Sequence, residues 1–350
     1  MYARLVMGVI MIAKKPFRVA IALNSAMAAS VLSCADVDFL RGFAEINPLE
    51  ELPDEMTLSF MERILDGADV CVTCWGTPAF TDEMIARADK LRLIAHAAGS
   101  VKNLVPASFW GSGKRICSNA PIIAEDVAQT VLAYILCSLK GLWGFSASTR
   151  AGAWSGGEAS RFKTHRLDGL HVGIVGASNV GREVIKILRP FGCDIALYDP
   201  YVSPIDARAL GVTLMGLDEL IAVCDVVSLH APALEGCRHM INNGNAPLFK
   251  DGALFINTAR GMLVDEPALI KELETGRIFA CIDVTDPEPP DASHPFRKLD
   301  NVILTPHIAG GHTVNGRLIL GENIINETYN YLTKGLLRYE VRREMLDLMA

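Results

Sequence analysis

Three polar side chains in the second half of the chain follow apolar segments that have the character of strands. Arg260 lies in the segment NTARG, Glu288 in DVTDPEP and His307 in TPHIAGG. In open α/β sheets, residues that follow parallel strands gather at the carboxyl edge of the sheet, where ligands bind. We therefore expect the guanidinium, the carboxylate and the imidazole to lie at the same edge.

These three groups suit the oxidation of a 2-hydroxy acid and the reverse reduction of a 2-oxo acid. The planar guanidinium of Arg260 can bind the substrate carboxylate with two hydrogen bonds. His307 can take the hydroxyl proton, and pairing with Glu288 would fix its tautomer and stabilise imidazolium. A nicotinamide would accept the hydride from the substrate C2. Each residue alone has a plainer interpretation, as a surface cation, a solvated carboxylate or a core histidine.

Residues 172–199 predict a site for a dinucleotide cofactor. Their sequence, VGIVGASNVGREVIKILRPFGCDIALYD, indicates a strand, a glycine turn, a helix and a second strand with an acidic residue at its tip. Gly176 permits the turn, Gly181 lets helix and strand pack closely, and the helix N-terminus offers N–H groups to a pyrophosphate. Asp199 can accept hydrogen bonds from the adenosine ribose and repel a 2′-phosphate. The pattern favours NAD over NADP.

Ser178 departs from the G-x-G-x-x-G pattern because it replaces the middle glycine. Its hydroxyl could donate to a phosphate oxygen, and serine also suits a helix N-cap. The alternative interpretation of the segment is a glycine-containing turn between strand and helix that binds no ligand. The complete strand, helix, strand and acidic tip favour the nucleotide site over that alternative.

The elements that position these residues alternate between strand-like and helical runs, which predicts parallel α/β architecture. In the first part we expect strands at 18–23, 69–74, 91–97 and 115–118, and helices at 54–66 and 82–88, the second capped by Thr81. A long apolar helix follows at 125–143. The second part is expected to form a six-stranded doubly wound sheet from 171–176, 194–198, 225–230, 253–258, 278–284 and 301–305. Its helices include 217–223 and 266–275, and a helical tail starts at 313.

Composition narrows the class of protein. Half of the 350 residues are hydrophobic and 21% are charged, so the chain is globular and long enough for two domains. The net charge of −7, without a long basic run, argues against a nucleic-acid partner. Nine cysteines scattered through apolar segments indicate reduced thiols and a cytoplasmic protein. We expect no metal site.

Two short segments could suggest other functions. Cys71 and Cys74 form a CxxC, but on a strand their side chains point to opposite faces, so buried thiols are favoured over a redox pair or a metal clip. The apolar run 5–13 resembles a short signal peptide, yet it is too short to span a bilayer and lacks a small-residue cleavage site. We therefore expect no membrane association and favour Met7 or Met11 as the natural initiator.

The segments SLHAP, GALFINTARGMLVDEPALIKELETGRI and ACIDVTDPEP resemble the D-isomer-specific 2-hydroxyacid dehydrogenase family. This family includes D-3-phosphoglycerate, glyoxylate/hydroxypyruvate and D-lactate dehydrogenases, and the likeness extends from about residue 91 to residue 331. The resemblance implies that Arg260 binds the substrate carboxylate and carbonyl, that Glu288 pairs with the catalytic histidine, and that His307 is the acid and base. These three residues form the expected catalytic set.

The nucleotide pattern and the resemblance together give the expected cofactor site. The resemblance implies that Asp283 holds the nicotinamide carboxamide and that His230 and Pro232 line the adenine and ribose side. The full expected set for NAD is Gly176, Ser178, Asn179, Val180, Gly181, Asp199, His230, Pro232, Thr258, Ala259, Asp283 and His307.

The resemblance also implies a substrate loop in the first half of the chain. In relatives, a glycine-rich loop after a strand offers backbone N–H groups to the substrate carboxylate, and HAAGSVK occupies that place here. The expected substrate residues are Ala98, Gly99 and Ser100, with Arg260. Many relatives have glycine in place of Ser100 and aspartate in place of Lys102. These departures concern the identity of the substrate more than the class of reaction.

The resemblance implies two doubly wound parallel-sheet domains. Residues 16–120, completed by 308–350, are expected to form a flavodoxin-like substrate-binding domain, and residues 121–307 a Rossmann NAD-binding domain. The apolar helix at 125–143 and the segment through Trp154 carry more hydrophobic surface than one domain needs. As in relatives, we expect a homodimer formed through the NAD-binding domains.

Two other functions remain open. Formate and phosphite dehydrogenases are relatives that act on substrates without a hydroxyl-bearing carbon, but formate dehydrogenases carry glutamine where Glu288 stands. An NAD(H)-sensing protein, similar to related transcriptional corepressors, would bind partners without turnover. The set of Arg260, Glu288 and His307 favours an enzyme acting on a small D-2-hydroxy acid.

Overall fold

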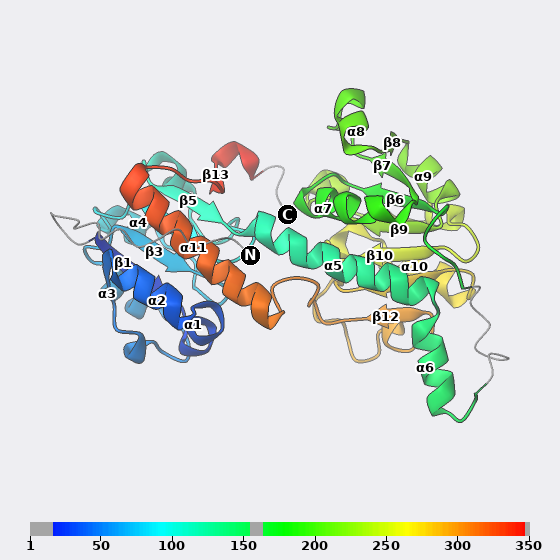
Figure 1. The fold of residues 1–350 in the computed structure, drawn as a ribbon, viewed down its shortest axis with the longest axis horizontal. Coiled ribbons are helices and arrows are strands. Elements are labelled where there is room, and N and C mark those ends of the chain that lie inside the picture. Colours follow the sequence, from blue (N-terminus) through cyan, green and yellow to red (C-terminus); the bar gives the residue numbers. More distant parts are fainter. Residues whose placement is uncertain (1–16, 155–163, 347–350) are drawn as a thin grey trace. The chain divides into compact units, whose positions relative to one another are not determined.

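The computed structural model describes residues 17–154 and 164–346. The chain divides into two compact units, each built on one sheet (Figure 1). The first unit runs through Asn119 and includes Arg317–Arg342, and the second contains Ala120–Gly316. The apolar run at 5–13, with Met7 and Met11, lies outside the described residues.

The second unit has a parallel sheet with the strand order β12-β11-β10-β9-β6-β7-β8. The order reverses beside β6, as in doubly wound sheets that bind nucleotides at this switch point. The expected six strands are present, and the two-residue β8 is an addition. The strands are β6 His171–Val175, β7 Asp194–Tyr198, β8 Thr213–Leu214, β9 Val226–Leu229, β10 Leu254–Asn257, β11 Phe279–Ile282 and β12 Val302–Leu304.

Helices cover both faces of this sheet because successive strand residues point to opposite sides. Ile174 of β6 belongs to a buried core shared with α5 and α7, whereas its neighbour Val175 belongs to a second core shared with α9 and α10. The two cores make the sheet doubly wound. The helices of this unit are α5 Ala120–Leu139, α6 Leu142–Arg150, α7 Asn179–Leu188, α8 Pro204–Leu210, α9 Leu217–Val223 and α10 Glu266–Glu274.

The apolar helix expected at 125–143 forms two helices instead of one. The first, α5, begins at Ala120 and ends at Leu139, and α6 follows Gly141, whose φ of 63° is left-handed. Glycine adopts this conformation without a steric penalty, so the chain can turn there. Among the described helices, α5 has the length and composition to cross a membrane, yet Val127 and Ile135 pack into the core with α7. We assign α5 to that core.

The first unit has a sheet with the order β13-β5-β4-β3-β1-β2, parallel except for β13. Four strands were expected, and β2 and β13 are additions. Both additional strands are too short to show an alternating pattern in the sequence. The strands are β1 Phe17–Ala22, β2 Ala44–Ile46, β3 Val70–Thr73, β4 Leu93–His96, β5 Arg115–Ser118 and β13 Glu340–Val341.

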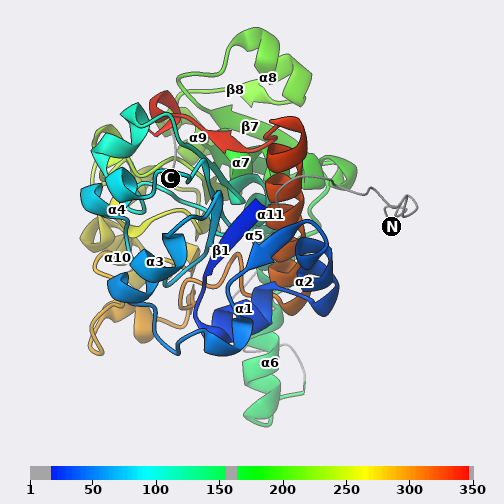
Figure 2. The same cartoon turned by 90° about the vertical axis from the view of Figure 1, so that its left-hand side faces the viewer.

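Helices α1, α2 and α11 cover one face of this sheet, and α3 and α4 lie on the other (Figures 1 and 2). Thr81 caps α4, as predicted, by accepting the Met84 N–H at 3.1 Å. The predicted start of the preceding helix at residue 54 was wrong, because Thr57 caps α3 through the Phe60 N–H at 3.2 Å. The helices are α1 Ser25–Val31, α2 Cys34–Arg41, α3 Leu58–Leu65, α4 Asp82–Arg87 and α11 Val314–Lys334.

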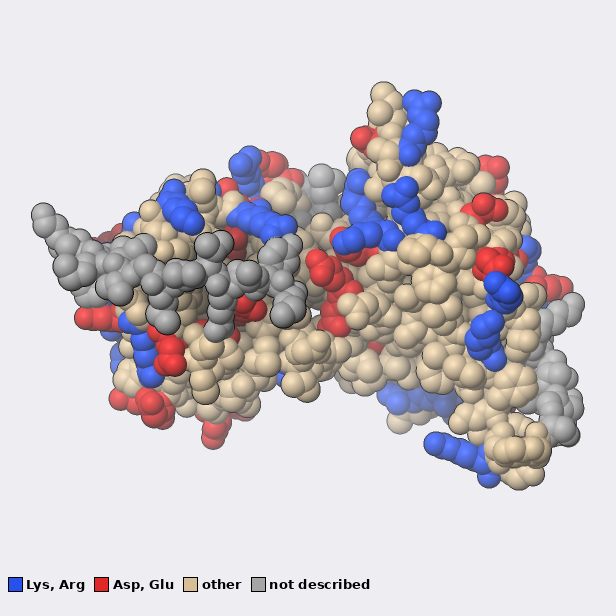
Figure 3. All heavy atoms as spheres, in the orientation of Figure 1, with Lys and Arg blue, Asp and Glu red and all other residues tan. Residues whose placement is uncertain are grey.

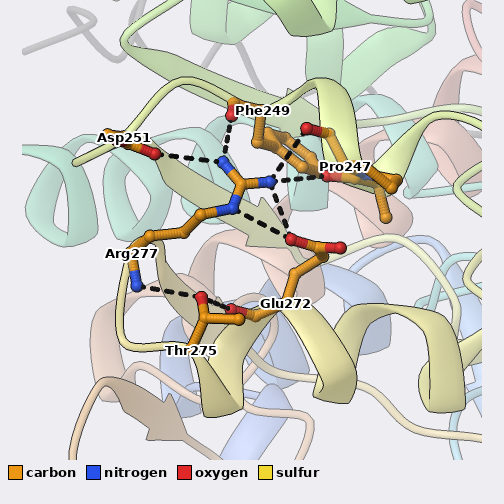
Figure 4. A network of polar contacts seen from close by, with 7 residues as sticks. Pro247, Phe249, Asp251, Glu272, Thr275 and Arg277 are labelled. Atoms are coloured by element: carbon orange, nitrogen blue, oxygen red, sulfur yellow. Dashed lines mark hydrogen bonds and ion pairs between the residues drawn. The ribbon is translucent and has the colours of Figure 1, made fainter.

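Arg277 fixes the carboxyl end of α10 to the loop that precedes β10 (Figure 4). Its Nε and Nη2 contact the Glu272 carboxylate at 2.9 and 2.8 Å, and its guanidinium also donates to the carbonyl oxygens of Pro247 and Phe249. The Thr275 hydroxyl donates to the Glu272 carbonyl at 2.6 Å. Because charged hydrogen bonds are stronger than neutral ones, this network anchors the end of α10.

The surface carries charged side chains of both signs. On the face drawn in Figure 3, lysine and arginine side chains stand in separate small groups among acidic and uncharged residues.

All nine cysteines lie among the described residues and are free thiols. Burial raises the pKa of Cys71 above its usual range and that of Cys74 to about 12, so both are inert at neutral pH.

Candidate active site

The glycine turn after β6 brings three backbone segments into close contact. Gly176 has a φ of 99°, and a Cβ built on it would lie 2.7 Å from the Ala231 nitrogen. A Cβ on Gly181 would lie 2.0 Å from the Gly176 oxygen. Only glycine fits either position, so the first turn of α7 can lie directly on the turn. This arrangement leaves the helix N-terminus close to the end of the sheet, as pyrophosphate binding requires.

Ser178 and Asp199 shape the ends of this turn. Ser178 is the N-cap of α7, and its hydroxyl accepts the Gly181 N–H at 3.4 Å. The Asp199 carboxylate, which follows β7, accepts the Ala177 N–H at 2.7 Å and the Tyr201 N–H at 2.8 Å. Asn179 and Val180 open α7. The replacement of the middle glycine by serine is therefore compatible with a capped helix beside an acidic strand tip.

Two buried polar atoms at the ends of β9 and β10 have no hydrogen-bond partner among the described residues. These atoms are Nδ1 of His230 and Oγ1 of Thr258. The Nε2 atom of His230 contacts the Ser228 hydroxyl at 2.9 Å, and burial lowers the pKa of this histidine to about 3, so the ring is neutral. An unpaired buried polar group is costly unless a ligand supplies its partner. The residues present therefore fit a polar cofactor at this edge, near the loop through Pro232.

Arg260 follows β10 in a short turn that its neighbours hold in place. The Asn257 side chain donates to the Arg260 carbonyl at 3.0 Å and accepts the Ala259 N–H at 3.0 Å. The guanidinium donates to the Ala259 carbonyl at 2.6 Å. Burial lowers the pKa of Arg260, and the charge of Glu288 acts in the opposite direction. Arg260 remains a cation that is partly removed from water, and the negative charge of Glu288 acts on its guanidinium.

His307 and Glu288 lie in direct contact, as expected from the sequence. The Nδ1 atom of His307 lies 2.6 Å from Oε1 of Glu288, and the two side chains are 44% and 41% exposed. Because Nδ1 is held by the carboxylate, Nε2 is the nitrogen available to a substrate. His307 has a φ of 54°, an uncommon value for a residue with a side chain. Such a conformation persists only where the surroundings fix it.

Hydrogen bonds to Asp283 hold the turn that carries His307. Its carboxylate accepts the Thr305 hydroxyl at 2.6 Å and the Ile308 and Ala309 N–H groups, each at 2.9 Å. Its carbonyl oxygen accepts the His307 N–H at 2.8 Å. The predicted contact of Asp283 with the nicotinamide carboxamide stays a prediction. What the geometry establishes is that this buried carboxylate closes the turn that carries His307.

Sequence reasoning missed the residues that support this turn. The Tyr134 hydroxyl on α5 lies 2.7 Å from the Thr305 hydroxyl, which in turn donates to Asp283. Burial raises the pKa of Tyr134 to about 12, so its hydroxyl stays protonated. A polar residue inside the apolar face of α5 was the available signal, but its partner lies 171 residues away in sequence.

The predicted substrate loop follows β4 in the first unit. Ala98 is buried and its carbonyl accepts the Asn119 N–H at 3.0 Å, while Ser100 is exposed. The involvement of Ala98, Gly99 and Ser100 with a substrate stays a prediction. Among the described residues, no group of three histidine, cysteine, aspartate or glutamate side chains is arranged to hold a metal ion.

Comparison with known proteins defines the class of this fold and site. Residues 132–309 match the NAD binding domain of the D-isomer specific 2-hydroxyacid dehydrogenases. The chain is 33% identical over 307 residues to D-3-phosphoglycerate dehydrogenase of Methanocaldococcus jannaschii, covering 87% of this chain and 57% of the relative. It is 30% identical over 287 residues to hydroxypyruvate reductase of Thermotoga maritima, covering 81% of this chain and 91% of the relative.

The chain belongs to the D-isomer specific 2-hydroxyacid dehydrogenase family. Its second unit contains the NAD-binding domain of that family, so NAD is the cofactor for which the site is built. A solved phosphoglycerate oxidoreductase from Rhizobium etli shares the fold, with a TM-score of 0.78, 23% identity and coverage of 94% of this chain and 99% of the other. The chain spans about half the length of several curated phosphoglycerate dehydrogenases that it matches.

Proposed function

We propose that this protein transfers a hydride between NAD(H) and a small D-2-hydroxy acid or the corresponding 2-oxo acid. The observation that carries the proposal is the 2.6 Å contact between Glu288 and His307, close enough to Arg260 for the Glu288 charge to act on its guanidinium. A cation for the substrate carboxylate and a paired imidazole for its hydroxyl are the two protein groups that this reaction requires.

The side chains divide the work of the reduction as follows. The Arg260 guanidinium binds the carboxylate of the 2-oxo acid and orients its carbonyl, and protonated His307 donates from Nε2 to the carbonyl oxygen. Glu288 holds Nδ1, so that imidazolium is stabilised before the transfer and the tautomer is fixed after it. Bound NADH supplies the hydride to C2. In the oxidation, neutral His307 takes the proton back.

Each part of the chain has a role in this reaction. Residues 121–307 act as the NAD-binding domain, with the pyrophosphate at the N-terminus of α7 and the adenosine ribose at Asp199. Residues 16–120, completed by 308–350, act as the substrate-binding domain, and the backbone of Ala98, Gly99 and Ser100 contributes N–H groups for the carboxylate. His230 and Thr258, whose buried atoms have no partner among the described residues, support the cofactor site.

The protein is also proposed to be cytoplasmic and to form a homodimer. Nine free cysteines, five of them buried, support a cytoplasmic protein, because a reducing compartment keeps thiols unpaired. The exposed apolar side chains on and after α6 support a homodimer: Leu142 is 51% exposed, Trp143 42% and Trp154 93%. Apolar surface of this kind is characteristic of subunit contacts.

Steady-state turnover tests the proposed function directly. Wild-type protein with NADH and a panel of 2-oxo acids is expected to oxidise NADH with at least one of them. His307→Ala should lower turnover about 10²–10⁴-fold while leaving NADH binding, measured by fluorescence titration, nearly intact. Arg260→Lys should raise KM more than it lowers kcat, because the planar fork is lost. NADH binding without turnover on any 2-oxo acid would favour a sensor, and an active His307→Ala variant would contradict the assignment.

A further inference from the structure

A carboxylate–imidazole pair, with a buried carboxylate and a half-buried ring, contacts the loop that carries Glu288. Glu266, the first residue of α10, is 8% exposed, and its Oε2 lies 3.1 Å from Nε2 of His294. Its other oxygen, Oε1, accepts the Asp286 N–H at 2.9 Å. Nothing in the sequence around His294 distinguishes it from an ordinary core histidine. Each carboxylate oxygen of Glu266 therefore has a partner in the structure. Oε1 contacts Asp286, which precedes Glu288, and Oε2 contacts His294, which follows it.

The tautomer of His294 follows from its second contact. The Phe296 N–H donates to Nδ1 of His294 at 3.3 Å, so the proton of the neutral ring stands on Nε2 and points to Glu266. The ring also lies against Phe296, with the ring centroids 4.8 Å apart, and Phe296 belongs to the core beneath α10. His294 is therefore a fixed donor.

Glu266 is fixed as well. It stands in the first turn of α10, where the helix dipole favours a carboxylate, and Asp265 caps the helix by accepting the Ala268 N–H. At the other end of the helix, Arg277 and Glu272 anchor α10 to the preceding loop (Figure 4). Because α10 is held at both ends, the Glu266 carboxylate is a fixed acceptor for the Asp286 N–H of the loop.

The same loop contacts the segment of Arg260. A Cβ on Gly261 would lie 2.0 Å from the Thr285 carbonyl carbon and 2.5 Å from the Asp286 nitrogen, so the two backbones touch. Asp286 stands two residues before Glu288, and the Glu266 contact determines where its N–H lies. Gly261, which follows Arg260, is thus packed against the segment that precedes Glu288.

We infer that Glu266 and His294 are positioning residues that hold Glu288 in register with His307. This inference rests on the proposed function, in which Glu288 stabilises protonated His307. Neither residue touches the reacting atoms. They act through the Asp286 N–H, and a loop freed from Glu266 would let Glu288 move away from Nδ1. Such a displacement, of the order of 1 Å, can lower turnover about 10²-fold.

Charged groups from neighbouring elements face the pair. His294 and Asp286 face Glu266, and Arg238 lies 3.7 Å from the Asp286 carboxylate. At the catalytic pair, Glu288 faces His307 and acts on Arg260. A change at Glu266 therefore reaches His307 through the position of Glu288.

The test compares the pH dependence of kcat/KM for reduction of the 2-oxo acid in full-length variants. Reduction needs imidazolium, so its rate falls at high pH, and loss of the Glu288 contact moves that fall to lower pH. Glu288→Gln gives the reference shift. Glu266→Ala should shift the profile in the same direction and lower kcat about 10- to 100-fold, with the NADH Kd within about twofold of wild type.

Three further variants separate positioning from stability. His294→Gln keeps a donor for Glu266 and should retain the wild-type profile, whereas His294→Ala should shift it. Glu272→Ala, the matched control at the other end of α10, should lower the melting temperature without moving the profile. Should Glu266→Ala fail to fold, Glu266→Gln and His294→Ala carry the test with the same expected direction, because the glutamine amide has one acceptor oxygen and cannot accept from both Asp286 and His294.

The outcomes distinguish the inference from the proposed function. A shifted profile in Glu288→Gln with a wild-type profile in Glu266→Ala and His294→Ala would overturn the inference alone. An unmoved profile in Glu288→Gln would overturn the proposed pairing, and the inference with it. Parallel shifts in the Glu288, Glu266 and His294→Ala variants, absent from Glu272→Ala, would establish the positioning role.

Discussion

At the residue scale, the conformation of His307 depends on the structure that surrounds it. A left-handed φ on a residue with a side chain costs about 1–2 kcal/mol. The turn is closed by the hydrogen bonds from the His307, Ile308 and Ala309 N–H groups to Asp283, which offset that cost. The imidazole therefore meets Glu288 in a geometry that the backbone determines before any substrate binds.

Asp199 combines two roles at the residue scale, since it closes the glycine turn through Ala177 and Tyr201 and stands where the adenosine ribose is proposed to bind. Asp199→Ala should weaken NADH binding and narrow the preference for NADH over NADPH, because the charge that repels a 2′-phosphate is removed. The measurement is kcat/KM with each cofactor. Glu219→Ala, an equal charge change on the exposed side of α9, serves as the control. Equal wild-type efficiency with both cofactors would contradict the role of Asp199.

At the element scale, the contact of α7 with the turn after β6 depends on two glycines. Gly181→Ala would place a methyl group 2.0 Å from the Gly176 oxygen, so α7 must move away from the sheet. We expect the free energy of unfolding of this variant to be about 1–3 kcal/mol lower than that of the wild type, and its affinity for NADH to be lower. Gly236→Ala, at a glycine with nothing within 4 Å of the added carbon, is the control. Denaturant unfolding and NADH titration check both expectations, and a Gly181→Ala protein that resembles the control would refute the close approach.

At the scale of the whole molecule, each unit buries one neutral histidine. Burial lowers the pKa of His96 to about 4 in the first unit and that of His230 to about 3 in the second. An unfolded histidine binds its proton near pH 6.5, so the unfolded state holds more protons than the folded state below that pH. Stability is therefore lost as the pH falls from about 6.5 toward these folded-state values, by about 1.4 kcal/mol per pH unit for each ring.

This pH dependence can be checked by melting the protein between pH 7 and pH 5. The melting temperature of the wild type should fall as the pH falls. In His96→Asn, which can keep a hydrogen bond to Thr73, the melting temperature of the first unit should depend less on pH. His171→Asn is the control, because His171 is exposed on the surface. An unchanged slope in His96→Asn would show that the buried histidine is not a source of the acid sensitivity.

The proposed dimer also belongs to the scale of the whole molecule. No residue of α6 is buried, although Leu142 and Trp143 are large and apolar. Light scattering at micromolar concentration should give twice the mass of the chain, and Trp143→Glu should reduce it to that of a monomer. Tyr201→Glu, which changes another exposed aromatic residue, should leave the mass unchanged. A monomeric wild type would exclude the dimer.

The sequence by itself determined the class of fold, the family and the three residues of the candidate site. The strands of the second unit are continuous apolar runs because both of their faces are buried, and such runs are visible in the chain. Arg260, Glu288 and His307 could be placed at one edge because parallel strands end at the same side of a sheet. Local patterns carried this information, since each depends on residues close together in sequence.

Tertiary structure alone decided how these residues are held. Thr305 meets Tyr134 across 171 residues, and Glu266 meets His294 across a loop whose path no local pattern defines. The short strands β2 and β13 likewise depend on pairing with β1 and β5, which lie far away in sequence. A hydrogen bond between residues far apart in sequence leaves no periodic signal, because its energy depends on where the folded chain places both partners. The positioning of the candidate site therefore belongs to the fold, and its chemistry to the sequence.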